Sequence, residues 1–411
     1  MKKVIIIFVN NSMAELDWIM PVIQKLSKKY YIFTYFRNKK TFETLQMNRQ
    51  LFSLWNEVNN SYFIENIFNN FFYKLSRKIL YFFQIKIFDK FLNYKIHSTS
   101  FFKKTIYRKL NNKNFNVEII FSDFGESFSA LKNLKLINDK KKKKPLIVHY
   151  PHTATAYEEK KNKFPVNLQG DILLLNRKRD IHYFKDYIDN SKIRISGIPK
   201  YDEWWIKKIL KDKSNIFDLD YSVKNLKKKL VITIGYYSRF DVPGLRNKEH
   251  LFKNQLIELM NVVSKIPNAF IIFKLHPRRN SLIFKKILDK YNKKIWQISK
   301  MHLIKLNNLS NCFINSVESS ACYDSLCLKI PTLQIWRIKG VEPKNGYLTK
   351  LGLVKNLKNV NELTKYLTLS LNKNHNLWKL QQRNFKNNCP YLGAATKKTL
   401  DIINQEIKRI C

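Results

Sequence analysis

The sequence lacks the glycine-rich turn that marks a dinucleotide site. Its first apolar run, residues 4–9, is predicted to be a buried strand, and Asn10, Asn11 and Ser12 follow where a G-x-G-x-x-G fingerprint would begin. Without those glycines the backbone cannot closely approach a pyrophosphate at this turn. We therefore expect no dinucleotide cofactor.

Cysteines and long apolar runs are also scarce. The odd number of cysteines, without C-x-x-C spacing, predicts reduced thiols and no structural zinc, as in a cytosolic chain. They are Cys312, Cys322, Cys327, Cys389 and Cys411. Residues 4–9 follow two lysines as in a signal peptide, but the run ends at Asn10 without a small-residue cleavage site. No stretch approaches the ~20 apolar residues of a membrane span, so we expect a cytoplasmic protein that can lie on a membrane without crossing it.

Acidic residues are few: 31, against 76 lysines and arginines, which gives a formal net charge of +45. Such a surface attracts anionic lipids, nucleic acids, nucleotides and anionic polymers. Lysine, asparagine and isoleucine are all abundant, and a biased composition would produce the same charge. The sequence also shows no recognition helix, zinc finger or RNA-binding aromatic motif, so a nucleic-acid partner is not favoured.

Apolar, β-branched runs alternate with amphipathic helical patterns along most of the chain, which predicts an α/β protein with two Rossmann-like halves and parallel sheets. Strands are predicted at 4–9, 31–36, 117–122, 145–149, 171–175 and 193–195, and again at 230–234, 269–277, 295–298, 312–314, 332–335 and 352–354. Helices are predicted at 14–28, 177–187, 250–264, 282–291, 321–328 and 396–409, and from residue 362.

This alternation suggests an N-terminal domain at 1–200, a bridge at 201–225 with Trp204 and Trp205, a second domain at 226–395, and a last helix at 396–411 that crosses back. Residues 40–115 depart from the pattern. From Phe63 to Lys95 they interleave aromatic and basic residues, which suits helices packed on the first domain or lying on an anionic membrane surface.

Basic and polar residues follow the predicted strand at 269–277. Pro277 ends the ladder, so His276 lies at the carboxyl end, flanked by Lys274 and Arg278. Ligands of open α/β sheets bind at that edge, so we expect these residues to face an anion. Arg239, in the turn after the strand at 230–234, can offer a bidentate contact to phosphate.

Two adjacent hydroxyls precede the predicted helix at 321–328. Ser319 and Ser320 are expected to cap that helix, whose unpaired amides suit a phosphate. Together with the residues after 269–277, they predict a nucleotide-phosphate site in the second domain.

The first domain carries candidate acid–base groups at strand ends. Asp123, Gly125 and Glu126 follow the strand at 117–122 and suit either an acid–base site or a helix N-cap. His152 follows the strand at 145–149 in a loop with two threonines. His152 or Asp123 is expected to act as the general base, and Glu126 stays open as a third choice.

The segment Lys274-Leu275-His276-Pro277, followed by Ser319-Ser320 and a helix, resembles the C-terminal half of GT-B transferases that build bacterial surface polymers. Within that group, it is similar to the CDP-glycerol glycerophosphotransferases and the bacterial polysialyltransferases, which carry a His-Pro and a Ser-Ser motif around a cytidine nucleotide. The resemblance covers mainly residues 230–336. In the first half, Asp123 and Gly125 match a polysialyltransferase acidic pair followed by glycine, although Phe124 replaces the second acid. His152-Thr153 matches two elements of the His-Gly-Thr-Pro loop of the CDP-glycerol enzymes.

The resemblance implies a GT-B fold with its active site in an interdomain cleft. It also implies a metal-independent transfer of a sugar or polyol phosphate from a nucleotide donor to a capsule polysaccharide, or to a lipid-linked acceptor of the cell envelope. The single D-x-D triplet, at 218–220, lies in the predicted bridge and gives no strong sign of a metal. Two alternatives stay open: a UDP-sugar 2-epimerase, with Asp123, Glu126 and Glu318 as candidate acids, and a non-enzymatic binder of nucleic acid or anionic polymer.

Overall fold

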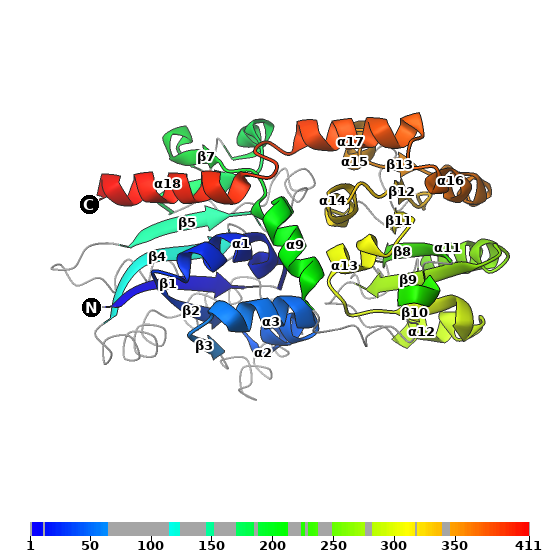
Figure 1. Ribbon diagram of the computed structural model, residues 1–411, viewed down its shortest axis with the longest axis horizontal. Helices are drawn as coiled ribbons and strands as arrows, with labels where there is room; N and C mark the ends of the chain where they lie inside the picture. Colours follow the sequence, from blue (N-terminus) through cyan, green and yellow to red (C-terminus); the bar gives the residue numbers. More distant parts are fainter. Residues whose placement is uncertain are drawn as a thin grey trace, which may run out of the picture. The chain divides into compact units, whose positions relative to one another are not determined.

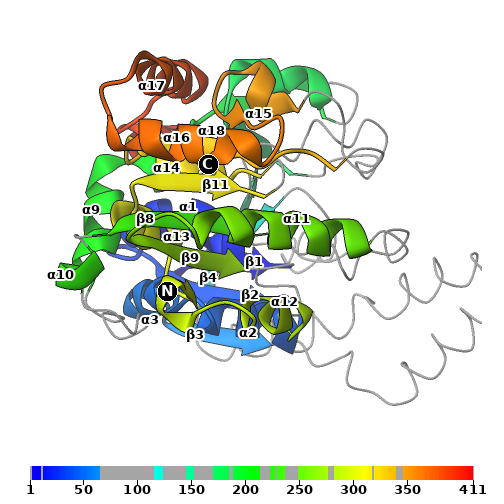
Figure 2. The same cartoon turned by 90° about the vertical axis from the view of Figure 1, so that its right-hand side faces the viewer.

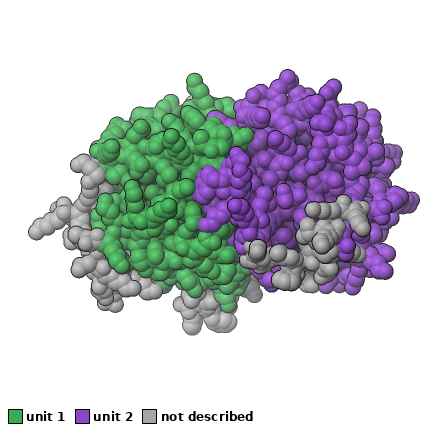
Figure 3. Space-filling model, viewed as in Figure 1, with its two compact units in different colours: residues 1–46, 52–202, 391–411 green, residues 47–51, 203–390 purple. Residues whose placement is uncertain are grey.

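The computed structural model describes residues 2–10, 13–64, 115–123, 145–151, 170–184, 188–212, 223–226, 229–236, 249–275, 282–316, 319–338 and 346–410. The chain forms two compact units (Figure 3). Unit 1 comprises residues 1–46, 52–202 and 391–411, and unit 2 comprises residues 47–51 and 203–390.

Unit 1 is built on a seven-stranded parallel sheet in the order β3-β2-β1-β4-β5-β6-β7 (Figure 1). Its strands are β1 (Lys2–Val9), β2 (Tyr31–Phe36), β3 (Ser61–Ile64), β4 (Phe115–Asp123), β5 (Leu146–Tyr150), β6 (Ile172–Leu175) and β7 (Ile193–Ile195). The order runs outward in both directions from β1 and β4, so the topological switch point lies between these two strands.

Both faces of this sheet are buried, as expected of central parallel strands with continuous apolar runs. Residues 4–9 of β1 are fully buried. On one face lie α1 (Met13–Leu26) and α18 (Ala395–Ile410), which pack against each other and, for α18, against β5 (Figure 1). Two further helices, α2 (Lys39–Gln46) and α3 (Arg49–Val58), connect β2 to β3.

The last helix is tied to unit 1 by residues far away in the sequence. Both carboxylate oxygens of Asp202 accept hydrogen bonds from the first turn of α18, from the amides of Ala395 at 2.9 Å and Thr396 at 2.7 Å. Near the other end of α18, Glu406 forms an ion pair with Arg194 of β7. The helix is therefore capped and held by groups that precede unit 2 in the chain.

Unit 2 contains a six-stranded parallel sheet in the order β10-β9-β8-β11-β12-β13. Its strands are β8 (Leu230–Tyr236), β9 (Ala269–Leu275), β10 (Trp296–Ile298), β11 (Cys312–Asn315), β12 (Thr332–Gln334) and β13 (Lys355–Asn356). This order has its switch point between β8 and β11.

Helices cover this second sheet on both faces (Figure 2). One core joins the sheet to α11 (Glu249–Val263), α12 (Leu282–Leu288), α16 (Asn361–Leu371) and the start of α17 (Asn376–Asn388). A smaller core on the opposite face includes residues of α10 (Val223–Leu226) and α13 (Leu303–Asn308). The remaining helices are α9 (Glu203–Lys211), α14 (Ala321–Leu326) and α15 (Tyr347–Lys350), and α14 packs on α13 and α17.

The predicted fold class is confirmed: each unit is a parallel sheet layered with helices. Three local predictions were wrong. The predicted α-helix at 177–187 is a 3₁₀ helix over Lys178–Tyr183, and the strand predicted at 352–354 lies at Lys355–Asn356. The α/β alternation was predicted to stop at residue 40, but it continues through α2, α3 and β3 over residues 39–64. Phe63 therefore belongs to β3 and not to a helix. The rest of the aromatic and basic segment lies outside the described residues.

The described part of the chain bears on two predictions, that the cysteines are reduced and that no helix spans a membrane. Cys312, Cys322, Cys327 and Cys389 lie in the described part of the chain and are not disulfide-bonded, while Cys411 lies outside it. Burial raises the pKa of the Cys312 thiol. Within the described ranges, no helix combines the length and the apolar character needed to cross a lipid bilayer.

Candidate functional site

In unit 1, buried polar groups gather at the carboxyl edge of the sheet, at its switch point. Asn10 directly follows β1, Asp123 ends β4, and Tyr150 ends β5 in register with Asp123. All three are buried, and Asp123 is only 1% exposed. Parallel strands bring their carboxyl ends to one edge, so residues far apart in the sequence meet here.

A second carboxylate belongs to this group. Glu15, in the first turn of α1, is fully buried, and its Oε2 accepts a hydrogen bond from the Asn10 amide at 2.7 Å. Thr41 donates its hydroxyl to the Asn10 carbonyl at 3.2 Å. The backbone of Asn10 is thus fixed from both sides, while its side-chain Nδ2 donates to no described residue.

The phenol of Tyr150 is held neutral. Burial raises its pKa well above the ordinary value, and the negative charges of Glu15 and Asp123 raise it further. Its ring stacks on Trp18 with centroids 5.3 Å apart, and Trp18 donates Nε1–H to Asn176 at 3.1 Å. In the described part of the chain the Tyr150 hydroxyl has no hydrogen-bond partner, so it is a positioned donor beside two carboxylates.

In unit 2, the switch point between β8 and β11 carries the serine motif. Gly235 of β8 pairs with Asn315 of β11, and the Ser316 amide donates to the Gly235 carbonyl at 3.1 Å. A Cβ at Gly235 would lie 2.8 Å from the Phe313 ring. A side chain at this position would have to displace the buried Phe313 ring, so glycine allows the two strands to pair here without that shift.

The two serines lie just beyond Asn315. Asn315 donates Nδ2–H to the Ser319 carbonyl at 2.9 Å, and the Ser319 hydroxyl accepts from the Ala321 amide at 3.3 Å. Ser320 occupies the N-cap position but makes no side-chain cap hydrogen bond. The predicted capping by both hydroxyls thus holds for Ser319 alone. Because α14 has only six residues, its dipole is weak, and the polar character of this turn comes mainly from its hydroxyl and amide groups.

The other predicted donor residues are placed only in part. Lys274 lies near the end of β9, and its ammonium group donates to the Lys300 carbonyl at 3.0 Å. Four donor-site candidates and the histidine base candidate lie outside the described residues: Arg239, His276, Pro277, Arg278 and His152. The same is true of Gly125, Glu126, Thr153, Glu318 and the D-x-D triplet. The structure thus brings Asp123 to the switch point of unit 1, and Ser319 and Ser320 to that of unit 2.

Sequence reasoning missed Glu15, Tyr150, Asn10 and Asn315. An acidic residue in a first helical turn is normally a solvated partner of the helix dipole, so Glu15 gave no signal of burial. Asn10 and Asn315 each directly follow a predicted strand. A polar residue immediately after an apolar strand is the signal that could have identified them. Among the described residues, no group of three or more histidine, cysteine, aspartate or glutamate side chains could hold a metal ion.

Comparisons with known proteins agree on the fold. No family model and no curated protein matches the sequence. Solved structures do match over the whole chain at low identity. UDP-N-acetylglucosamine 2-epimerase from Rickettsia bellii matches with a TM-score of 0.58 and 14% identity, covering 100% of this chain and 98% of its own. A glycosyltransferase from Rickettsia africae gives 0.53 and 12%, covering 99% of each chain.

The wall teichoic acid polymerase TagF, solved with CDP-glycerol, gives a TM-score of 0.51 and 13% identity, covering 98% of this chain and 88% of its own. These proteins share two parallel-sheet units of the GT-B type. The chain therefore has the GT-B fold found in glycosyltransferases, in TagF and in UDP-N-acetylglucosamine 2-epimerases.

Proposed function

We propose that this protein is a transferase that moves a sugar or a polyol phosphate from a nucleotide donor to a surface polysaccharide or lipid-linked acceptor. One observation carries the proposal: in each unit, polar side chains stand at the switch point of a doubly wound sheet, which is where ligands of such sheets bind. The GT-B fold and the likeness to glycosyltransferases support the same reaction class.

The donor is assigned to unit 2. The hydroxyls of Ser319 and Ser320 and the amides of their turn can donate hydrogen bonds to the donor phosphates. Asn315 holds the turn by donating to the Ser319 carbonyl. His276, Pro277 and Arg278 follow β9 directly in the sequence, and Arg239 follows β8. We assign these residues and Lys274 to the same nucleotide-phosphate site. TagF was solved with CDP-glycerol, and HepE from Anabaena with UDP and glucose, which supports an activated donor of this class.

The acceptor is assigned to unit 1, with Asp123 or His152 as the general base. The base takes the proton of the acceptor hydroxyl while the hydroxyl oxygen forms a bond to the anomeric carbon of the donor sugar. In a glycerophosphate transfer, the hydroxyl oxygen bonds to phosphorus instead. The bond to the nucleotide breaks, and the nucleotide leaves with the electron pair. Hydroxyl, amide and cationic donors of unit 2 would stabilise the charge that develops on its phosphates, so the reaction needs no bound metal.

Tyr150 has a defined part in this scheme. A tyrosine hydroxyl is protonated at neutral pH, and burial raises the pKa of Tyr150 further, so the phenol can donate a hydrogen bond to an acceptor hydroxyl. We assign the reaction to the cytoplasm or the inner face of the membrane, where nucleotide donors are made, and to the synthesis of capsule or other cell-envelope polymers.

A UDP-sugar 2-epimerase is the second candidate. Two observations favour it: the match to the Rickettsia bellii epimerase has a higher TM-score than the matches to the glycosyltransferases named above, and unit 1 buries two carboxylates, Glu15 and Asp123. Both activities would use a nucleotide sugar, but only a transferase requires an acceptor.

The experiment that separates them uses UDP- and CDP-linked donors with and without a glycan or glycerol phosphate acceptor. For a transferase, nucleotide release coupled to product formation requires the acceptor and falls by at least about a hundredfold in an Asp123→Asn or His152→Ala variant. Interconversion of a UDP-sugar without acceptor would identify the epimerase instead. If no donor is consumed under either condition, the transferase proposal fails.

A further inference from the structure

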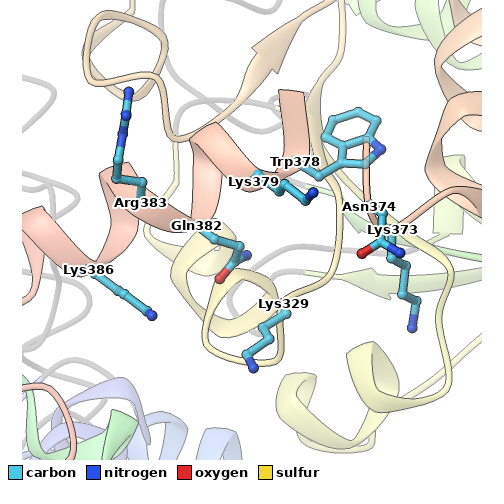
Figure 4. A pocket seen from close by; sticks show the side chains of 8 residues that line it. All are labelled: Lys329, Lys373, Asn374, Trp378, Lys379, Gln382, Arg383 and Lys386. Atoms are coloured by element: carbon cyan, nitrogen blue, oxygen red, sulfur yellow. The ribbon is translucent and has the colours of Figure 1, made fainter. Parts of the chain in front are cut away.

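Unit 2 contains a basic pocket that the proposed reaction does not use. It has a volume of about 440 Å³ and lies between α17 and the loops that follow α14 and α16 (Figure 4). Its lining residues are Lys329, Lys373, Asn374, Trp378, Lys379, Gln382, Arg383 and Lys386. The volume is that of a small-molecule site.

The charge of this pocket has one sign. Five of its eight lining residues are cationic, and the other three are neutral. The sequence contains no acidic residue between Glu362 and Asp401, so α17 supplies no partners for its own cations. All five cationic side chains are exposed, whereas Trp378 is buried, and its indole Nε1–H donates to the Leu369 carbonyl at 3.0 Å. The pocket therefore has a rigid aromatic wall and a cationic rim.

Two of the five cations lie on one face of α17. Lys379 and Lys386 share this face with Gln382, at spacings of three and four residues. Gln382 and Lys386 reach from α17 toward the loop that carries Lys329, while Arg383 extends the other way (Figure 4). Seven residues of helix separate Lys379 from Lys386 by about 10 Å along the axis. A row of this length can contact phosphate groups at more than one position.

Lys329 occupies an unusual backbone position. It has a φ of +60°, in the left-handed region, where the chain turns after α14. Its amide donates to the Leu326 carbonyl at 3.0 Å, and the Ile330 amide donates to Ser325 at 3.1 Å. Glycine is the usual residue at this kind of helix end because any Cβ is strained there. The lysine at this turn lines the pocket.

This pocket is distinct from the proposed donor site. α14 leaves the carboxyl end of β11 and returns the chain to the start of β12, so Lys329 lies at the amino edge of the sheet. Lys373 likewise follows α16, which returns from β13. Ser319 and Ser320 lie at the opposite, carboxyl edge.

We propose that the pocket binds an anion carrying two or more phosphate groups, either a soluble oligophosphate or neighbouring phospholipid headgroups. Lysine ammonium groups, with three rotatable donors each, suit the tetrahedral oxygens of phosphate. A ligand with phosphates spaced along its length matches the row from Lys379 to Lys386. Gln382 and Asn374 add neutral donors between the charges.

The test is titration calorimetry of the full chain with phosphate, pyrophosphate and tripolyphosphate at fixed low salt. The proposal predicts saturable binding that strengthens with the number of phosphates and weakens with added salt. Lys379→Ala and Lys329→Gly should each weaken tripolyphosphate binding about threefold to fivefold, and the double variant about tenfold or more. Lys329→Gly also relieves the left-handed position, so a loss of binding there cannot come from a misfolded turn.

Two controls match these changes. Lys265→Ala removes an exposed lysine elsewhere in unit 2, and Asn268→Gly relieves another left-handed residue, at φ +58°, without changing charge. Both should bind tripolyphosphate as the wild type does. Tripolyphosphate can also occupy the proposed donor site, so the pocket accounts for the part of the binding that persists in Ser319→Ala. If Ser319→Ala abolishes all binding while the pocket variants do not weaken it, the ion occupies the donor site and the pocket proposal is wrong.

A second arm identifies the source of the phosphates. Sedimentation with phosphatidylglycerol vesicles, against phosphatidylcholine vesicles, is measured for the same variants. Pocket-dependent sedimentation without tripolyphosphate binding assigns the pocket to lipid headgroups, and tripolyphosphate binding alone assigns it to a soluble phosphate compound. If neither probe responds to Lys329→Gly and Lys379→Ala, the proposal is refuted.

Discussion

Replacing Asp202 by alanine should loosen the C-terminal helix from unit 1. Asp202 is 1% exposed, and its carboxylate accepts two backbone hydrogen bonds, from Ala395 and Thr396. Loss of an N-cap costs about 0.5–2 kcal/mol, and a buried amide left without an acceptor costs about 1–3 kcal/mol. We expect a total of about 3 kcal/mol for the opening of α18.

Hydrogen exchange measured by mass spectrometry reports this opening directly. An energy of about 3 kcal/mol corresponds to roughly a hundredfold faster exchange of the α18 amides in Asp202→Ala. Asp202→Asn, which keeps one acceptor oxygen, should show a smaller increase. Asp401→Ala is the matched control, because Asp401 is an exposed aspartate on the same helix. Exchange in Asp202→Ala within about threefold of the wild type, or an equal change in Asp401→Ala, would refute the reasoning.

Three further predictions concern the two switch points. Asp123→Asn should reduce turnover, measured by donor consumption, at least about a hundredfold. Its free energy of unfolding, measured in urea, should stay within about 1 kcal/mol of the wild type. Full activity would exclude Asp123 as the base. Tyr150 has a raised pKa, so its stabilising contribution is present below its unfolded pKa and is lost as pH rises above about 10. Tyr150→Phe should therefore lose less stability than the wild type between pH 9 and about 11; parallel curves would contradict this. Gly235→Ala should cost about 1–3 kcal/mol of unfolding free energy, because its Cβ meets the Phe313 ring; an unchanged urea midpoint would contradict the close approach.

Most strands could be predicted because buried parallel strands are continuous runs of apolar, often β-branched residues, and such runs are visible in the sequence. Residues 31–36 and 193–195 were predicted with the bounds that the structure shows, and the first of these runs is buried along nearly its whole length. β3 and α17 were missed because each buries little apolar surface. β3 is a four-residue edge strand without a fully buried residue, and α17 buries only Trp378, Gln381 and Phe385 in an otherwise polar helix. Neither segment carries the apolar periodicity on which the prediction depended.

The candidate site could be predicted only as far as strand ends. Ser319 and Asp123 were identified because a polar residue after an apolar strand lies at the ligand edge of a parallel sheet. Their position at the switch point depends on which strands pair, as between Gly235 and Asn315, eighty residues apart in the sequence. Glu15 could not be identified, because its burial comes from long-range packing that a single sequence does not record.

The central claim is that unit 2 binds a nucleotide through the serine turn. It is tested most directly by thermal shift with CMP, CDP, UDP and GDP, since a ligand that binds only the folded state raises the melting temperature. We predict a saturable rise with at least one of these nucleotides and a much smaller rise in the Ser319→Ala/Ser320→Ala double variant, each compared with its own ligand-free melting temperature. No rise with any nucleotide, or an equal rise in the double variant, would contradict the account.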